Sequence, residues 1–165
     1  MNIFITGKRN CGKTTLLESV LDKLNKTYSG FESRPYYENG ATKGYCFHSF
    51  VDVSKNDTIF SKGRNGNTEV FEIFGVECLE NSLSDDSKII IMDEIGRFES
   101  NAVKFLSILE KCLDSEKNIL GILKKEYLPH IEKIKGRNDV YIFDMDNEDK
   151  DKIYNSIVKL MGKER

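Results

Sequence analysis

The chain carries Gly7-Lys8-Arg9-Asn10-Cys11-Gly12-Lys13-Thr14, which reads G-x-x-x-x-G-K-[ST], the pattern of a phosphate-binding loop. A short apolar run, Ile3-Phe4-Ile5, precedes it, and apolar residues at helical spacing follow it from Leu16 to Leu24. The loop is therefore expected between a strand and a helix. In that setting successive backbone N–H groups form a concave anion site, and the start of the helix adds the positive end of its dipole. This stretch predicts a site for a nucleoside triphosphate.

The loop positions have separate expected roles. Lys13 should reach the β- and γ-phosphates, and the hydroxyl of Thr14 should bind Mg²⁺. Cys11 could be redox-sensitive, because a helix N-terminus lowers a thiol pKa, but this motif position accepts any residue and a variable loop residue is the favoured interpretation. We predict that the nucleotide-binding residues are Gly7, Lys8, Arg9, Asn10, Cys11, Gly12, Lys13, Thr14 and Thr15.

Composition narrows the class of protein. The 165 residues, 39% of them hydrophobic and 32% charged, fit one globular domain over residues 1–165. The net charge of −2 gives no general attraction to nucleic acid or to an anionic membrane. The chain shows neither an apolar run of membrane-spanning length nor a signal-peptide pattern, so we expect it in the cytoplasm. The four cysteines form no C-x-x-C pair, and His48 and His130 are isolated, so neither a zinc site nor a disulfide frame is predicted, and both histidines are expected to be structural or surface residues.

The order of apolar patterns predicts an α/β fold. Strands are expected at 2–6, 88–95, 119–123 and 140–143, and helices at 13–25, 75–83, 100–114, 126–135 and 147–162. Between them, residues 28–74 form a β-rich insertion with strands at 29–37, 42–51, 57–61 and 68–74. Asn39-Gly40 is a strong hairpin signal within it. The aromatic residues of this insertion could stack on a base, but packing of the strands on one another is the favoured interpretation. Alternating strands and helices predict a mostly parallel central sheet flanked by helices.

A second element of the site follows the apolar run Ile89-Ile90-Ile91-Met92, a pattern typical of a strand buried on both faces. Asp93 and Glu94 end this strand, at the sheet edge where parallel strands place their ligands. Asp93 is expected to hold Mg²⁺ opposite Thr14, and Glu94 to act as general base for the attacking water. Arg97, which follows within one short turn, is the preferred candidate for stabilising developing charge, ahead of Lys8 and Arg9.

With Asp93-Glu94-Ile95-Gly96 the chain resembles the THEP-type (cancer-related) nucleoside-triphosphatases, which are small P-loop proteins. The similar segments are Ile5 to Leu16, Gly30-Phe31, Ile90 to Arg97, Gly121 to Leu123 and Arg137 to Val140. The resemblance implies a RecA-like fold and a slow, Mg²⁺-dependent ATPase or GTPase of broad nucleotide choice. By this resemblance Lys13 and Thr14 bind phosphate and metal, Asp93 supports the metal and Glu94 activates water. We predict that the catalytic residues are Lys13, Glu94 and Arg97. Arg97 stands where the family usually has Lys, and Ile122 where Thr is common.

Two other functions use the same loop. A nucleotide or small-molecule kinase would replace water by an acceptor hydroxyl, although residues 124–137 form a poor Arg-rich lid. A nucleotide-operated switch without turnover would fit Asp93-x-x-Gly96, which matches D-x-x-G, but the guanine-reading N-K-x-D is absent. Hydrolysis is the preferred interpretation, with a nucleoside triphosphate as the expected partner and no prediction for protein partners.

Overall fold

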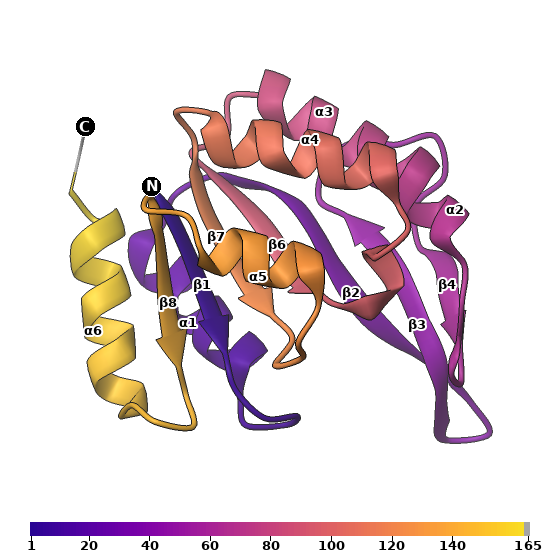
Figure 1. Cartoon of the computed structure of the whole chain (residues 1–165), viewed down its shortest axis with the longest axis horizontal. Helices are drawn as coiled ribbons and strands as arrows, with labels where there is room; N and C mark the ends of the chain where they lie inside the picture. Colours follow the sequence, from indigo (N-terminus) through magenta and orange to yellow (C-terminus); the bar gives the residue numbers. More distant parts are fainter. Residues whose placement is uncertain (164–165) are drawn as a thin grey trace.

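The computed structural model describes residues 1–163, which form one eight-stranded sheet with helices on both faces (Figure 1). The elements in chain order are β1 (Asn2–Thr6), α1 (Lys13–Leu24), β2 (Tyr28–Glu38), β3 (Ala41–Ser49), β4 (Thr58–Lys62), β5 (Asn65–Gly66), α2 (Thr68–Val70), η1 (Phe71–Gly75), α3 (Val76–Ser84), β6 (Ile89–Ile95), η2 (Arg97–Glu99), α4 (Val103–Asp114), β7 (Asn118–Leu123), α5 (Pro129–Lys135), β8 (Val140–Asp144) and α6 (Lys150–Met161).

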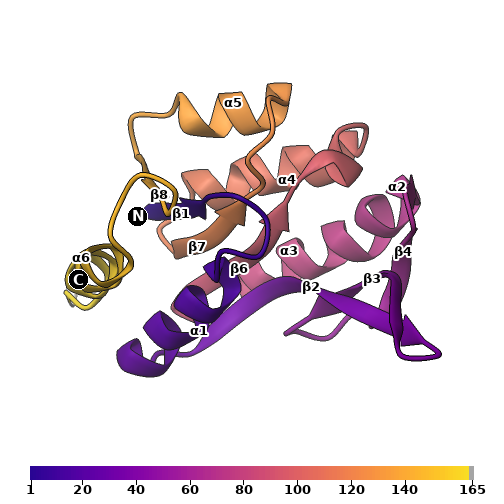
Figure 2. The same cartoon turned by 90° about the horizontal axis from the view of Figure 1, so that it is seen from below.

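The sheet has the strand order β5-β4-β3-β2-β6-β7-β1-β8. The five strands β2, β6, β7, β1 and β8 run parallel, and β3, β4 and β5 extend the sheet in antiparallel fashion. This arrangement confirms the predicted α/β class. β7 lies between β1, which leads into the phosphate loop, and β6, which ends in the two acids. The carboxyl ends of these three strands therefore meet at one edge of the sheet, the end seen in Figure 2.

Alternate residues of the central strands face opposite layers. Ile3 and Ile5 of β1 pack in one buried cluster with apolar residues of α1 and α6. Phe4, between them, belongs to the other cluster, which contains residues of α3, α4 and α5. Successive side chains of a β-strand point to opposite faces of the sheet, which explains this alternation. Because helices cover both faces of the sheet, β6 has an uninterrupted apolar run from Ile89 to Met92. Ile89, Ile90 and Met92 are fully buried.

The predicted hairpin is present, and its first strand belongs to the central sheet. β2 and β3 pair in antiparallel fashion on either side of Asn39-Gly40, and both turn residues have positive φ, 50° and 77°. β2 also pairs in parallel with β6, from Tyr28 opposite Ile89 to Glu32 opposite Asp93. The hairpin thus extends the parallel sheet sideways, and it places the amino-terminal half of β2 beside the acidic end of β6.

The prediction of a strand at 68–74 is wrong, because residues 68–84 are helical through α2, η1 and α3. The side chain of Asn67 accepts the N–H of Glu69 at 3.0 Å and caps this helical stretch. Val70 and Phe71 are both buried although they are adjacent, which fits a helix and not a strand with one exposed face. The Phe71 ring packs edge-on against Phe60, at 4.9 Å between ring centroids. The aromatic run that suggested a strand is explained by this buried cluster.

The other elements lie close to their predicted positions. β4 and the closing helix begin one and three residues later than expected, at Thr58 and Lys150, and α5 begins at Pro129, the first-turn position where proline is tolerated. Phe31 and Phe47 of the hairpin stack on each other at 4.9 Å and are buried, so these two rings pack the strands and are not available to a base. Within residues 1–163, every helix is too short or too polar to cross a membrane.

Candidate active site

A pocket of about 870 Å³ opens at the carboxyl ends of β1, β6 and β7. Figure 2 shows this edge of the sheet, with the loop between β1 and α1 running across it. Every residue predicted for the site lines this pocket: Gly7, Lys8, Arg9, Asn10, Cys11, Gly12, Lys13, Thr14, Thr15, Asp93, Glu94 and Arg97. The structure therefore brings together residues that lie up to 90 positions apart in the chain.

The phosphate loop has the backbone that its glycines predict. Gly12 has a φ of 91°, a left-handed conformation that a side chain would strain, and α1 begins at the next residue. At Gly7, a Cβ would lie 2.9 Å from the Sγ of Cys11. The ammonium of Lys13 turns back over the loop and donates to the carbonyl oxygens of Gly7, at 3.1 Å, and Lys8, at 2.8 Å. These contacts hold a positive charge beside the N-terminus of α1.

Asp93 meets the phosphate loop directly. The hydroxyl of Thr14, in the first turn of α1, donates to the Asp93 carboxylate at 2.9 Å. Asp93 pairs with Ile122 of β7, which pairs with Ile5 of β1, so the three residues lie side by side across the sheet. Burial raises the pKa of Asp93 to about 7, and the hydrogen bond from Thr14 opposes that rise. Burying the ionised carboxylate is costly, and a nearby cation would offset that cost.

Glu94 is half-buried, and its carboxylate accepts no hydrogen bond within residues 1–163. Burial raises its pKa, and the positive charges of Lys124 and Lys13 oppose the rise. A carboxylate with free lone pairs and a raised pKa, in a polar pocket beside a phosphate site, has the properties of a general base. The two neighbouring acids thus have different surroundings, because Asp93 contacts α1 whereas Glu94 is left open to the pocket.

The backbone after Glu94 is held by two side chains that the sequence analysis did not assign to the site. Glu99 is buried and its Oε2 accepts the N–H of Gly96 at 3.0 Å. The imidazole Nε2 of His130 lies 2.7 Å from the carbonyl oxygen of the same glycine. His130 thus has a structural contact, as predicted. These bonds anchor the turn from β6 into η2, and with it the backbone of Arg97.

The cations named as candidates are placed differently. Arg97 is exposed in η2, and its guanidinium carbon lies 5.2 Å from the centre of the Phe98 ring. Lys8 and Arg9 are exposed on the phosphate loop. All three line the pocket, and none makes a side-chain ion pair within residues 1–163.

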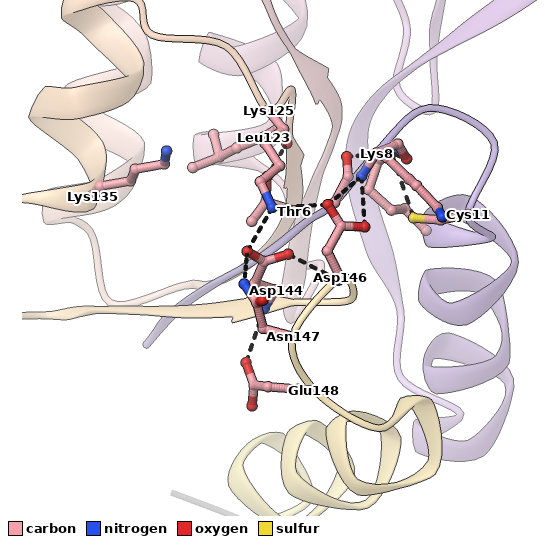
Figure 3. A network of polar contacts seen from close by, with 12 residues as sticks. Thr6, Lys8, Cys11, Leu123, Lys125, Lys135, Asp144, Asp146, Asn147 and Glu148 are labelled. Atoms are coloured by element: carbon pink, nitrogen blue, oxygen red, sulfur yellow. Dashed lines mark hydrogen bonds and ion pairs between the residues drawn. The ribbon is translucent and has the colours of Figure 1, made fainter.

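The loop after β8 braces the phosphate loop, as Figure 3 shows. Both carboxylate oxygens of Asp146 accept the backbone N–H of Lys8, at 3.0 and 3.1 Å. The ammonium of Lys125, two residues after β7, bridges Asp146 and Asp144 at 2.8 and 2.9 Å. Lys125 holds the pKa of Asp146 below its usual range. The sequence analysis missed this network, although acids directly after a core strand were a signal for it.

Comparison with known proteins agrees with this geometry. A family model described as NTPase matches residues 2–158. The nucleoside-triphosphatase THEP1 of Thermotoga sp. (strain RQ2) is 33% identical over 171 residues, which cover 98% of this chain and 95% of the relative. The nucleoside-triphosphatase THEP1 of Methanocaldococcus jannaschii is 28% identical over 173 residues, with 96% and 98% covered.

Two solved structures share the fold. The crystal structure of THEP1 from the hyperthermophile Aquifex aeolicus aligns with a TM-score of 0.79 and 24% identity, over 99% of this chain and 100% of that chain. The solution structure of a human cancer-related nucleoside triphosphatase aligns with a TM-score of 0.73 and 21% identity, over 99% and 98%. The P-loop fold, the assembled pocket and the family match agree with the resemblance, and the chain therefore belongs to the NTPase family and is a nucleoside-triphosphatase.

Proposed function

We propose that this enzyme hydrolyses nucleoside 5′-triphosphates such as ATP and GTP to the diphosphate and phosphate, with Mg²⁺ as cofactor and Glu94 as general base. The observation that carries the proposal is the 2.9 Å contact between Thr14 and Asp93. It joins the phosphate loop to the acidic end of β6 and leaves Glu94 beside them in the same pocket.

Thr14 and Asp93 fit Mg²⁺ by their chemistry. Both offer oxygen atoms, which this hard cation prefers, and both line an open polar pocket in which the ion could keep several waters. The buried position of Asp93 points the same way, because a divalent cation would offset the cost of a buried negative charge. When bound, the ion would neutralise charge on the phosphate oxygens.

The chain's own residues then account for binding and proton transfer. Lys13 would exchange its present contacts with the Gly7 and Lys8 carbonyls for phosphate oxygens, and the loop N–H groups would hold the phosphate chain. Glu94 would accept a proton from a water as the water oxygen bonds to the γ-phosphorus. The bond from that phosphorus to the bridging oxygen breaks, and its electron pair leaves with the diphosphate. Arg97 would stabilise the charge that develops.

Phosphate release with Mg²⁺ by wild type and by Glu94→Gln tests the general base. The variant should lose about 100-fold or more in kcat, within the usual contribution of general acid–base catalysis. It should still bind a non-hydrolysable triphosphate. Glu126→Gln is the matched control, since Glu126 lines the same pocket but pairs with Lys124 at 3.2 Å. Equal turnover by Glu94→Gln and wild type would show that another group activates the water.

The cofactor is tested separately with chelated enzyme. Turnover should vanish with EDTA and return on addition of Mg²⁺. Thr14→Ala should need more Mg²⁺ for half-maximal rate, because it removes one of the two oxygen ligands. Undiminished turnover in excess chelator would refute the assignment of a divalent cation to Thr14 and Asp93.

A further inference from the structure

The pocket extends beyond the part that the phosphate chain of a nucleoside triphosphate would occupy. Beyond Glu94 it continues across β2, β3 and β4 into a region that we call the outer chamber, lined by Ser33, Tyr45, Ser61, Arg64 and Phe98. From β1 to β4 the sheet advances five strand spacings, about 24 Å, whereas β6 lies only two spacings, about 10 Å, from β1. A phosphate chain that reaches from the loop to Glu94 therefore ends before the outer chamber begins.

The outer chamber carries positive charge without a protein partner. Arg64 lines it and makes no ion pair within residues 1–163, and Arg97, at the boundary between the chamber and the triphosphate site, makes none either. Lys124 and Lys125 are engaged, since Lys124 pairs with Glu126 at 3.2 Å and Lys125 with the acids after β8. Lys8 and Arg9 also make no ion pair within residues 1–163, but they belong to the phosphate loop. Two free guanidinium groups in one hollow favour an anion, and the planar guanidinium fork matches phosphate oxygens in particular.

The turn that carries Arg64 is held against the edge of the catalytic site. Gly63 and Arg64 connect the paired residues Lys62 and Asn65 of β4 and β5. The next residue, Gly66, lies against the Phe98 ring so closely that a Cβ there would be 2.2 Å from a ring carbon. Phe98 is also the ring over which Arg97 lies. Packing thus ties the turn of Arg64 to η2, next to the predicted γ-phosphate position.

We propose that the outer chamber binds a phosphate dianion beyond the γ-phosphate, on the side of η2, with Arg64 as the principal ligand and the hydroxyl groups of Ser33 and Tyr45 beside it. The proposal rests on the proposed function, since it takes the loop side of the pocket to be the triphosphate site. The dianion is either the orthophosphate that hydrolysis releases or the phosphate group of a second small molecule.

The test fills the triphosphate site first. The full-length protein is saturated with Mg²⁺ and a non-hydrolysable ATP analogue, so that the γ-phosphate position is occupied, and orthophosphate is titrated by calorimetry at constant ionic strength. Wild type should bind orthophosphate, and Arg64→Gln should bind it about tenfold more weakly, the loss expected for one charge-assisted contact. Lys62→Gln is the matched control, because Lys62 is also an exposed cation, lies two residues from Arg64 and does not line the pocket.

A second titration, with a nucleoside monophosphate in place of orthophosphate, distinguishes the two sources. Uptake of orthophosphate alone assigns the chamber to the product, and uptake of the monophosphate assigns it to a second substrate. In both cases Arg64→Gln must weaken the uptake. Binding of neither probe, or binding that Arg64→Gln and Lys62→Gln change equally, would overturn the proposal. Turnover that still depends on Glu94 in that event would leave the proposed hydrolysis standing, so the two failures are distinguishable.

Discussion

Replacing Glu99 with glutamine should stabilise the fold at pH 8 far more than at pH 5. The Glu99 side chain is 3% exposed, and its carboxylate accepts the N–H of Gly96 at 3.0 Å. Burial raises the pKa of Glu99 from 4.5 to about 7, because the ionised carboxylate loses its hydration. The folded chain therefore holds this proton more tightly than the unfolded chain. The stabilisation is fully present below pH 4.5 and is lost as the pH rises through 7.

The magnitude follows from the size of the shift. One pKa unit corresponds to about 1.4 kcal/mol, so ionised Glu99 costs the folded state about 3 kcal/mol once the pH is above both pKa values. Glutamine keeps an oxygen for the N–H of Gly96 and carries no charge. In urea denaturation followed by circular dichroism, the advantage of Glu99→Gln over wild type should grow by about 2 to 3 kcal/mol between pH 5 and pH 8.

Asp139→Asn serves as a control of opposite sign. A hydrogen bond from Arg137 holds the pKa of Asp139 below its ordinary value, so its contribution to stability is present near neutral pH and is lost on acidification. This variant should be less stable than wild type at pH 7 and approach it as the pH falls below 3.8. If Glu99→Gln changes the free energy of unfolding equally at pH 5 and pH 8, the buried ionised carboxylate is not the cause and the reasoning fails.

Two further substitutions test the frame around the site. Asp146→Asn should raise KM for the triphosphate about threefold to tenfold, because it weakens the contact that braces the phosphate loop. Asp139→Asn, at the other end of β8, should leave KM unchanged. Equal KM values for the two variants would count against the brace. Gly30→Ala should destabilise the fold by more than about 3 kcal/mol in urea, because its Cβ would lie 2.0 Å from the carbonyl oxygen of Ile91. Gly40→Ala has the same sign of φ but open space around its Cβ, so it should cost only about 1 kcal/mol, and an equal loss in both variants would contradict the packing explanation.

Local sequence patterns predicted the parts of the site that are built from residues adjacent in the sequence. The phosphate loop needs only its own glycines, its lysine and the helix that follows, and all of these are adjacent in sequence from Gly7 to Thr14. The acids near the end of β6 were predictable because an uninterrupted apolar run indicates a strand covered on both faces, and such strands end at the binding edge of a parallel sheet. The assigned roles of Glu94 and Arg97 stay predictions until turnover is measured.

Contacts between distant segments were not predictable in this way. The brace from Asp146 to Lys8 joins positions 138 apart, and the anchor from His130 to Gly96 joins positions 34 apart. Neither contact has a specific local signature: the acids after β8 were only a weak signal, because an acid after a strand, like a lone histidine, occurs in many surroundings. Although the helix predicted at 75–83 is present as α3, the helical conformation of residues 68–74 was missed for a related reason. Its buried phenylalanine, Phe71, belongs to an aromatic cluster supplied by several strands and helices, and tertiary packing therefore decided its conformation.

The register of β6 links the packing of the core to the chemistry of the site. Ile89 and Ile91 face the layer formed by α1 and α6, and Asp93 continues the same alternation. That is why the carboxylate of Asp93 points toward Thr14, the first-turn residue of α1. A slip of one residue would turn this carboxylate toward the opposite layer and leave the hydroxyl of Thr14 without it. The isoleucines that bury this strand therefore also place the predicted metal ligand, so substitutions that shift the strand should weaken binding of Mg²⁺ even where they leave every loop residue in place.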